Sequence, residues 1–250
     1  MIRRFTGAYL AAFIITELSM APAHAQFGLV SEKQELEAGR TADAEITSKY
    51  RISHDSYYNA LVSHLGTRIT RVCKRPNIPW TFRVIDSKEL NAFSVPGYVY
   101  VNTGLIEATG RDQDQLAGVI EHEVGHTCGK HAVKNMEKGT IGNVLVSLIG
   151  GRNKAVSGLA NVAANLIMLG YSRDEENDAD KRAVHYTVRA GYDPSGLVRF
   201  FEMLQQKEGN GTNIVYFRTH PPTSDRIARV QQNIARETGS GYSPDRVRYR

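Results

Sequence analysis

The run from His122 to His126 constrains this chain more than any other feature of its sequence. It reads His-Glu-Val-Gly-His, with two histidines four positions apart and a glutamate directly after the first. On a helix, residues four apart lie one turn apart on the same face, so both imidazoles can bind a single Zn²⁺ ion. Glu123 would then stand beside the metal, where it can take a proton from a water molecule as general base. The spacing therefore predicts a helical metal site suited to hydrolysis.

The residues before this motif predict the helix that it needs. Asp112 and Gln115 have the spacing of a capping box, in which an N-cap acceptor and its N3 partner start a helix. Apolar residues then recur at helical spacing and form a stripe beside the histidine pair: Leu116, Val119, Ile120 and Val124. We predict a helix of about four turns that ends at Gly129 or Gly139.

A catalytic zinc site needs a third protein ligand and an open position for water. A histidine six residues after His126 is one possibility, but that position holds Ala132. His131 comes one residue early, about 100° around the helix from the required place. The other possibility is a glutamate from a second helix.

The acidic segment 174–180 can supply this glutamate. Among its glutamates only Glu176 has a carboxylate four positions later, at Asp180. That spacing puts a ligand and a second acid on one helix face, where the acid can orient a metal-bound histidine. The alternative is a solvated acidic helix start, which the helix dipole favours. The upstream motif favours the ligand, and Gly191 with Pro194 predicts the helix end.

Four blocks of the sequence together resemble one protein family. They are His122–His126, the segment 171–180, Asn91–Phe93 with Pro96 and Gly97, and Arg218–Pro222. They are similar to the HtpX-like and CAAX prenyl protease-like zinc metallopeptidases, in particular to the soluble, exported bacterial branch of the BepA and LoiP type. The resemblance covers roughly residues 32 to 234. Relatives often have two glycines where Gly97 stands alone, and we expect no repeat-containing C-terminal domain.

The resemblance implies an α+β, mainly helical zincin (gluzincin) fold with a small sheet beside the H-E-x-x-H helix. It implies endopeptidase activity on protein substrates and one Zn²⁺ per chain, with three metal ligands: His122, His126 and Glu176. Glu123 would be the general base, Asp180 would support catalysis, and His220 would lie near the metal.

Two roles for His220 remain open from its chemistry. It could donate a hydrogen bond to the oxyanion that forms during catalysis, or its neutral imidazole could fill the open metal position and keep the enzyme latent. A third interpretation has it packed at the following proline turn without any role at the metal. The position before Pro221 favours an extended backbone, which helps to project the side chain.

The first 25 residues have the features of an export signal. A basic start precedes a short apolar core, and an Ala-His-Ala cleavage site ends at Ala25. The core is too short to span a bilayer and contains Glu17. We therefore predict a periplasmic or secreted single domain over 26–250, with a loosely attached tail from about 236. Because no cysteine lies near the cleavage site, we expect no lipid anchor. We also expect no transmembrane helix in the mature chain.

The composition agrees with one soluble catalytic domain. The chain has 250 residues, of which 41% are hydrophobic and 23% charged. Removal of the signal takes away Arg3, Arg4 and Glu17, so the net charge falls from +5 to +4. This mild charge, without a nucleic-acid-binding motif, predicts no nucleic-acid partner.

The only two cysteines are Cys73 and Cys128. An even pair in an exported chain predicts a disulfide between two helices beside the site, and two buried free thiols are the alternative. Cys128 lies about 200° around the helix from His126, which argues against a cysteine ligand.

The remaining patterns predict helices over 32–50, 56–72, 195–209 and 224–235, and strands over 80–85 and 95–101. The second strand could pair with an extended substrate or be an ordinary core strand. The apolar segment 140–170 could be a helical hairpin that acts as a lid, as a hydrophobic substrate surface or as a peripheral membrane contact. The alternative is two core helices.

Taken together, these patterns predict an exported zinc endopeptidase that acts in envelope protein quality control. Its substrates would be proteins or peptides, misfolded envelope proteins among them. The rival hypothesis is a periplasmic chaperone or assembly factor whose protease site is mostly shut.

Overall fold

The computed structural model describes residues 30–135, 137, 162–168, 170–212, 214–221 and 225–239. Three predicted features lie largely outside these residues. They are the export signal, most of the apolar segment 140–170 and the tail beyond 239. Of the apolar segment, the structure describes its last part, where a short helix forms.

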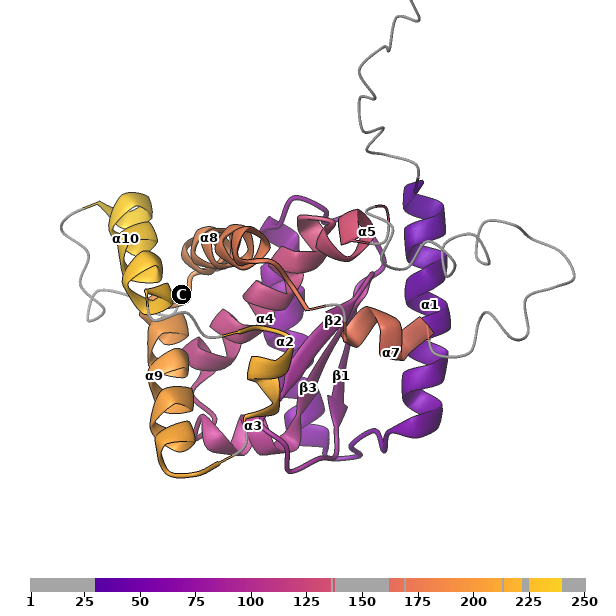
Figure 1. Cartoon of the computed structure of the whole chain (residues 1–250), viewed down its shortest axis with the longest axis horizontal. Helices are drawn as coiled ribbons and strands as arrows, with labels where there is room; N and C mark the ends of the chain where they lie inside the picture. Colours follow the sequence, from indigo (N-terminus) through magenta and orange to yellow (C-terminus); the bar gives the residue numbers. More distant parts are fainter. Residues whose placement is uncertain are drawn as a thin grey trace, which may run out of the picture.

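The described residues form a mainly helical α+β fold around a small sheet (Figure 1). The helices are α1 (Glu32–Lys49), α2 (Ser56–Val72), α3 (Thr103–Ala108), α4 (Gln113–Cys128), α5 (His131–Asn135), α7 (Val162–Ile167), α8 (Arg173–Ala190), α9 (Ser195–Gly209), the 3₁₀ helix η2 (Val215–Arg218) and α10 (Arg226–Thr238). The predicted helices agree with α1, α2, α4, α8, α9 and α10 to within a few residues. None of the described helices is long and apolar enough to cross a membrane.

The sheet has three strands, β1 (Thr81–Ile85), β2 (Ala92–Val95) and β3 (Tyr98–Asn102), in the order β1-β3-β2. β3 pairs in parallel with β1 and antiparallel with β2. Alternate residues point to opposite faces. Val99 and Val101 pack toward α2 and α4, whereas Phe93 and Tyr100 pack toward α1 and α7.

The prediction of one strand over 95–101 is wrong. Pro96 and Gly97 form a two-residue turn, and Val95 pairs with Tyr98 across it. Gly97 has φ +84°, and a proline followed by a residue with positive φ suits a tight turn. The Pro-Gly pair therefore separates two strands instead of starting one, and β2 becomes the edge strand beside α4.

The helix that carries the motif begins and ends as its flanking residues predict. The Asp112 carboxylate accepts hydrogen bonds from the backbone N–H groups of Asp114 and Gln115, and Gly129 is the C-cap. The predicted capping box is only half formed, because the Gln115 amide donates to the Asp112 carboxylate instead of accepting from the backbone. Almost the whole helix is buried, with α8 and α9 packed on it.

Candidate metal centre

Four of the six predicted site residues converge on one point inside the fold. His122, His126, Glu176 and His220 each offer one ligand atom, and these atoms all lie within 4.8 Å of one another. The first two come from α4, Glu176 from the first turns of α8, and His220 from the chain after η2. All four side chains are buried.

The distances between these atoms suit a tetrahedral cation. The Nε2 atoms of His122 and His126 are 3.0 Å apart, and each lies 3.5 Å from a carboxylate oxygen of Glu176. With zinc bonds of about 2.0–2.1 Å, neighbouring ligand atoms of a tetrahedral site are roughly 3.3 Å apart. The His₂Glu donor set and its spacing therefore fit a zinc ion.

Local features of α4 and α8 bring these donors together. Ser172 and Glu175 form a complete capping box, so the Glu175 carboxylate is used at the helix start while Glu176 points into the site. Gly125 lies at a close approach of the two helices, since a Cβ there would meet the carbonyl oxygen of Ala179 at 3.0 Å. The absence of a side chain at Gly125 thus allows α8 to pack close enough to α4 to bring Glu176 to the motif histidines.

Asp180 lies where the i, i+4 spacing predicted, behind His122. Its Oδ1 is 2.9 Å from Nδ1 of His122, which leaves Nε2 of that ring directed at the cluster. Burial alone would raise the pKa of Asp180, but the Arg226 guanidinium and the hydrogen bond with His122 lower it to about 2. Asp180 is therefore an ionised acceptor.

Arg226 is a buried site residue that the sequence did not suggest. Its Nε and Nη2 donate to the two carboxylate oxygens of Asp180 at 2.8 and 2.9 Å, and its Nη1 lies 2.9 Å from Glu176. Its guanidinium stacks over Phe201, 4.3 Å from the ring centroid. An arginine in an arginine-rich C-terminal segment carries no spacing signal, so only the docking of α10 reveals it.

The carboxylates make this cluster receptive to positive charge. Burial alone would lower the pKa of His122, but hydrogen bonds with Asp180 and Glu176 raise it to about 9. Burial would likewise raise the pKa of Glu176, yet His220 and the two motif histidines hold it well below its usual value.

Glu123 faces the same space and is held by the edge strand. The Ser94 hydroxyl donates to Oε2 of Glu123 at 3.0 Å and to its backbone carbonyl oxygen at 3.1 Å. The other oxygen, Oε1, lies 3.3 Å from Nε2 of His220. Burial raises the pKa of Glu123, although nearby His220 and His122 oppose this. Ser94 is the second site residue that the sequence did not suggest.

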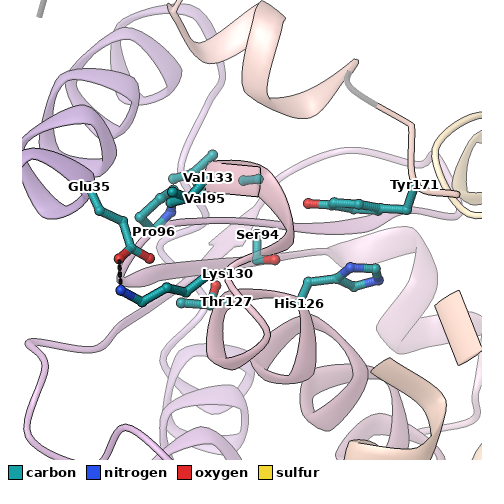
Figure 2. Close-up of a pocket in the computed structure, with 10 residues that line it drawn as sticks. Glu35, Ser94, Val95, Pro96, His126, Thr127, Lys130, Val133 and Tyr171 are labelled. Atoms are coloured by element: carbon teal, nitrogen blue, oxygen red, sulfur yellow. Dashed lines mark ion pairs between the residues drawn. The ribbon is translucent and has the colours of Figure 1, made fainter. Parts of the chain in front are cut away.

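A small pocket adjoins the cluster between β2 and Tyr171 (Figure 2). The Tyr171 ring stacks on His126 with the centroids 3.7 Å apart, and Ser94 lies on the strand side. The ion pair of Glu35 with Lys130 stands at the far end. The cavity has a volume of about 10 Å³, roughly the space for one water molecule, so it is too small for a substrate side chain.

The predicted disulfide is absent from the structure. Cys73 and Cys128 are both free and buried. They lie within hydrogen-bonding contact. That hydrogen bond, together with one from Tyr186, lowers the pKa of Cys128 to about 7 against the effect of burial. The expected proximity of the two helix ends is confirmed. The prediction of a disulfide bond rested only on the even number of cysteines and on the predicted export of the chain. The free-thiol alternative is the one that the structure has.

This fold and this constellation define a metallopeptidase of the H-E-x-x-H class, with a third donor supplied by a second helix. Residues 57–234 match peptidase family M48, and the chain belongs to that family. The resemblance drawn from the four sequence blocks is thereby confirmed.

Several curated proteins are similar to this chain. A putative beta-barrel assembly-enhancing protease of Vibrio cholerae is 26% identical over 84% of this chain and 45% of its own length. The metalloprotease YcaL of Escherichia coli is 28% identical over 69% of this chain and 71% of its own length. The mitochondrial metalloendopeptidase OMA1 of Schizosaccharomyces pombe is 26% identical over 94% of this chain and 74% of its own length. The chain spans less than half the length of the assembly-enhancing proteases that it matches.

Proposed function

We propose that this protein is an exported, zinc-dependent endopeptidase that hydrolyses peptide bonds of envelope proteins in quality control. The observation that carries the proposal is the convergence of His122, His126 and Glu176 within 4.8 Å, with Glu123 beside them. Relatives named beta-barrel assembly-enhancing protease support envelope proteins as the substrate class. The predicted export signal supports a location in the periplasm or outside the cell.

Each side chain at the site has its own chemical role. A bound zinc ion would supply a Lewis acid for water and for the peptide carbonyl. Glu123 takes the proton of the attacking water and passes it to the leaving amine. Burial raises the pKa of Glu123 and so makes it a stronger base, and the Ser94 hydroxyl holds one of its oxygens. Asp180 fixes His122, so that the lone pair of Nε2 faces the cluster.

The first test separates chemistry from metal binding. Glu123→Gln removes the base and no proposed ligand, so it should keep zinc and lose casein cleavage by about 10²- to 10⁴-fold. Glu121→Gln is the matched control, because Glu121 lies two positions earlier on α4 and accepts from Thr187. Burial raises the pKa of Glu121 well above its usual value, so a neutral amide should replace it without loss of activity. Activity retained in Glu123→Gln would contradict the proposal.

The same variant tests the substrate class. Glu123→Gln, expressed in the producing cell, should retain uncleaved substrates that can be purified with it and identified by mass spectrometry. We expect outer-membrane and periplasmic proteins to be purified with Glu123→Gln in larger amounts than with the Glu121→Gln control. Recovery of cytoplasmic proteins alone would contradict an envelope role.

A second function, an assembly factor with a latent protease site, is favoured by one observation at His220. Its Nδ1 lies 2.9 Å from Oε1 of Glu176 and 3.3 Å from Nε2 of His122, where an open metal position is expected. For this function, wild type and Glu123→Gln should bind an unfolded outer-membrane protein equally well and wild type should cleave it slowly.

His220→Ala distinguishes the two roles of that histidine, because they predict opposite signs. Casein cleavage should rise if His220 blocks the metal, and it should fall if His220 stabilises the oxyanion, by about 10²-fold or more. An unchanged rate at unchanged zinc content would leave only the packing role. Phe217→Leu, a change of a partly buried residue on the preceding turn, is the control for local packing.

A further inference from the structure

His131, which has the wrong position for a metal ligand, lies against one of the proposed ligands instead. It is the first residue of α5 and is 1% exposed. Its Nδ1 lies 3.0 Å from Nδ1 of His126, and its Nε2 lies 3.1 Å from Oδ2 of Asp178 on α8. The three side chains form a continuous line from α8 to the metal cluster.

The turn between α4 and α5 is built to place this ring. Gly129 ends α4, and a Cβ at that position would meet Nε2 of His131 at 2.4 Å. Lys130 follows with φ +55°, a conformation that residues other than glycine rarely adopt. The chain therefore reverses within two residues and directs His131 back toward His126. A histidine packed at random on a helix end would not need this backbone.

The protonation of each ring follows from the partner at the end of the line. Asp178 is a carboxylate paired with Arg182 at 2.6 Å, and an ionised carboxylate only accepts hydrogen bonds. Nε2 of His131 must then carry the proton, which leaves its Nδ1 as an acceptor. Nδ1 of His126 carries the next proton and donates to that acceptor. The lone pair of His126 is thereby placed on Nε2, the atom that faces His122 and Glu176.

We propose that His131, oriented by Asp178, is a positioning residue that fixes the ring orientation and tautomer of the ligand His126. The inference rests on the proposed function, because it concerns the same metal site. His122 receives this support directly from the Asp180 carboxylate, whereas His126 receives it from Asp178 through an interposed imidazole. One helix, α8, thus supplies a ligand and both carboxylates that orient the two histidines of α4.

The test measures zinc affinity of the purified protein by competition with a chromophoric chelator. His131→Ala should weaken zinc binding by about 10- to 100-fold, the usual effect of removing the hydrogen-bond partner of a ligand. His131→Asn places an amide oxygen near the position of Nδ1 and should recover most of that loss. His185→Ala is the matched control, since His185 lies on the exposed side of α8 and pairs with Glu237.

Two further measurements keep the result interpretable. Asp178→Ala leaves the buried ring in place, so it should weaken zinc binding by about tenfold even if His131→Ala fails to fold. Nitrogen NMR of histidine-labelled, zinc-loaded protein should find the proton of His131 on Nε2 and that of His126 on Nδ1.

The outcomes separate this inference from the proposed function. A wild-type protein that binds no zinc overturns both. Wild-type binding with unchanged affinity in His131→Ala and Asp178→Ala overturns only the positioning role. Equal losses in His131→Ala and His131→Asn, or a proton on Nδ1 of His131, also overturn it.

Discussion

Two polar clusters lie on opposite faces of the sheet, and they differ in how their charges are satisfied. On the α1 side, Asp43 accepts from Nε and Nη2 of Arg83 at 2.7 and 2.8 Å and from the Tyr100 hydroxyl at 2.6 Å. On the α4 side, one ring nitrogen each of His122 and His126 and the carboxylate of Glu176 face one another. The first cluster is held by its own donors, whereas the second has the donor set of a cation site.

This difference teaches how to separate a structural charge network from a binding site. Both clusters pair an arginine with an aspartate. In the Asp43 cluster the contacts with Arg83 and Tyr100 each join a donor to an acceptor, which is the stable arrangement of polar groups inside a fold. In the metal cluster Arg226 donates to Asp180 and its Nη1 approaches Glu176, while ring nitrogens of His122 and His126 converge on the same glutamate. The convergence of possible metal ligands, more than charge, marks the functional site.

The largest effect that the comparison predicts is at Glu176. Glu176→Ala removes one donor of the convergent set, so zinc content should fall from about one per chain to near zero and casein cleavage should be lost. Atomic absorption on the purified protein measures the metal. Glu175→Ala removes the helix cap and the contact with Asn135 but no proposed ligand, so it should keep zinc while lowering the free energy of unfolding by about 1 kcal/mol. Full zinc in Glu176→Ala would break the assignment of the donor set.

A smaller effect is expected at Ser94, which touches the base and no proposed ligand. Its hydrogen bond to the Glu123 carboxylate should contribute about 1–2 kcal/mol, so Ser94→Ala should lower kcat by about tenfold at unchanged zinc content. Ser94→Thr keeps the hydroxyl and should restore most of the rate. Equal kcat values for wild type and Ser94→Ala would show that the strand does not hold the base.

The smallest effect on activity is expected for changes in the Asp43 cluster. Tyr100→Phe removes one hydrogen bond to Asp43 and should lower the free energy of unfolding by about 1 kcal/mol. Asp43→Ala leaves Arg83 half-buried without its partner and should cost about 1–3 kcal/mol. Urea denaturation measures both, and zinc content with the rate per folded molecule should equal the wild-type values. Loss of zinc in either variant would erase the distinction between the clusters.

The sequence was sufficient where spacing along one helix carried the information. The motif histidines, their helix caps and the pairing of Glu176 with Asp180 all depend on periodicity within α4 or α8, and the structure has them together. The same periodicity excluded His131 as a ligand.

What the sequence missed depends on contacts between elements. Ser94 and Arg226 are ordinary residues of a strand and a helix until tertiary packing brings them to Glu123 and Asp180. The predicted strand 95–101 runs through the Pro96-Gly97 turn, because Pro-Gly ends one element as readily as it begins another and only strand pairing separates the two cases. The role of His131 required the reversed turn at Lys130, which no spacing rule contains.

Arg226 and His220 also bear on when the site is assembled. His122 meets His220 across 98 positions of sequence and Arg226 across 104, so the centre assembles only after α10 has docked on α8. Contacts of such long range form late in folding, and chains emerge from synthesis with their N-terminal part first. Because Arg226 lies near the end of the sequence, Glu176 and Asp180 gain the guanidinium that they share only after almost the whole chain has been made.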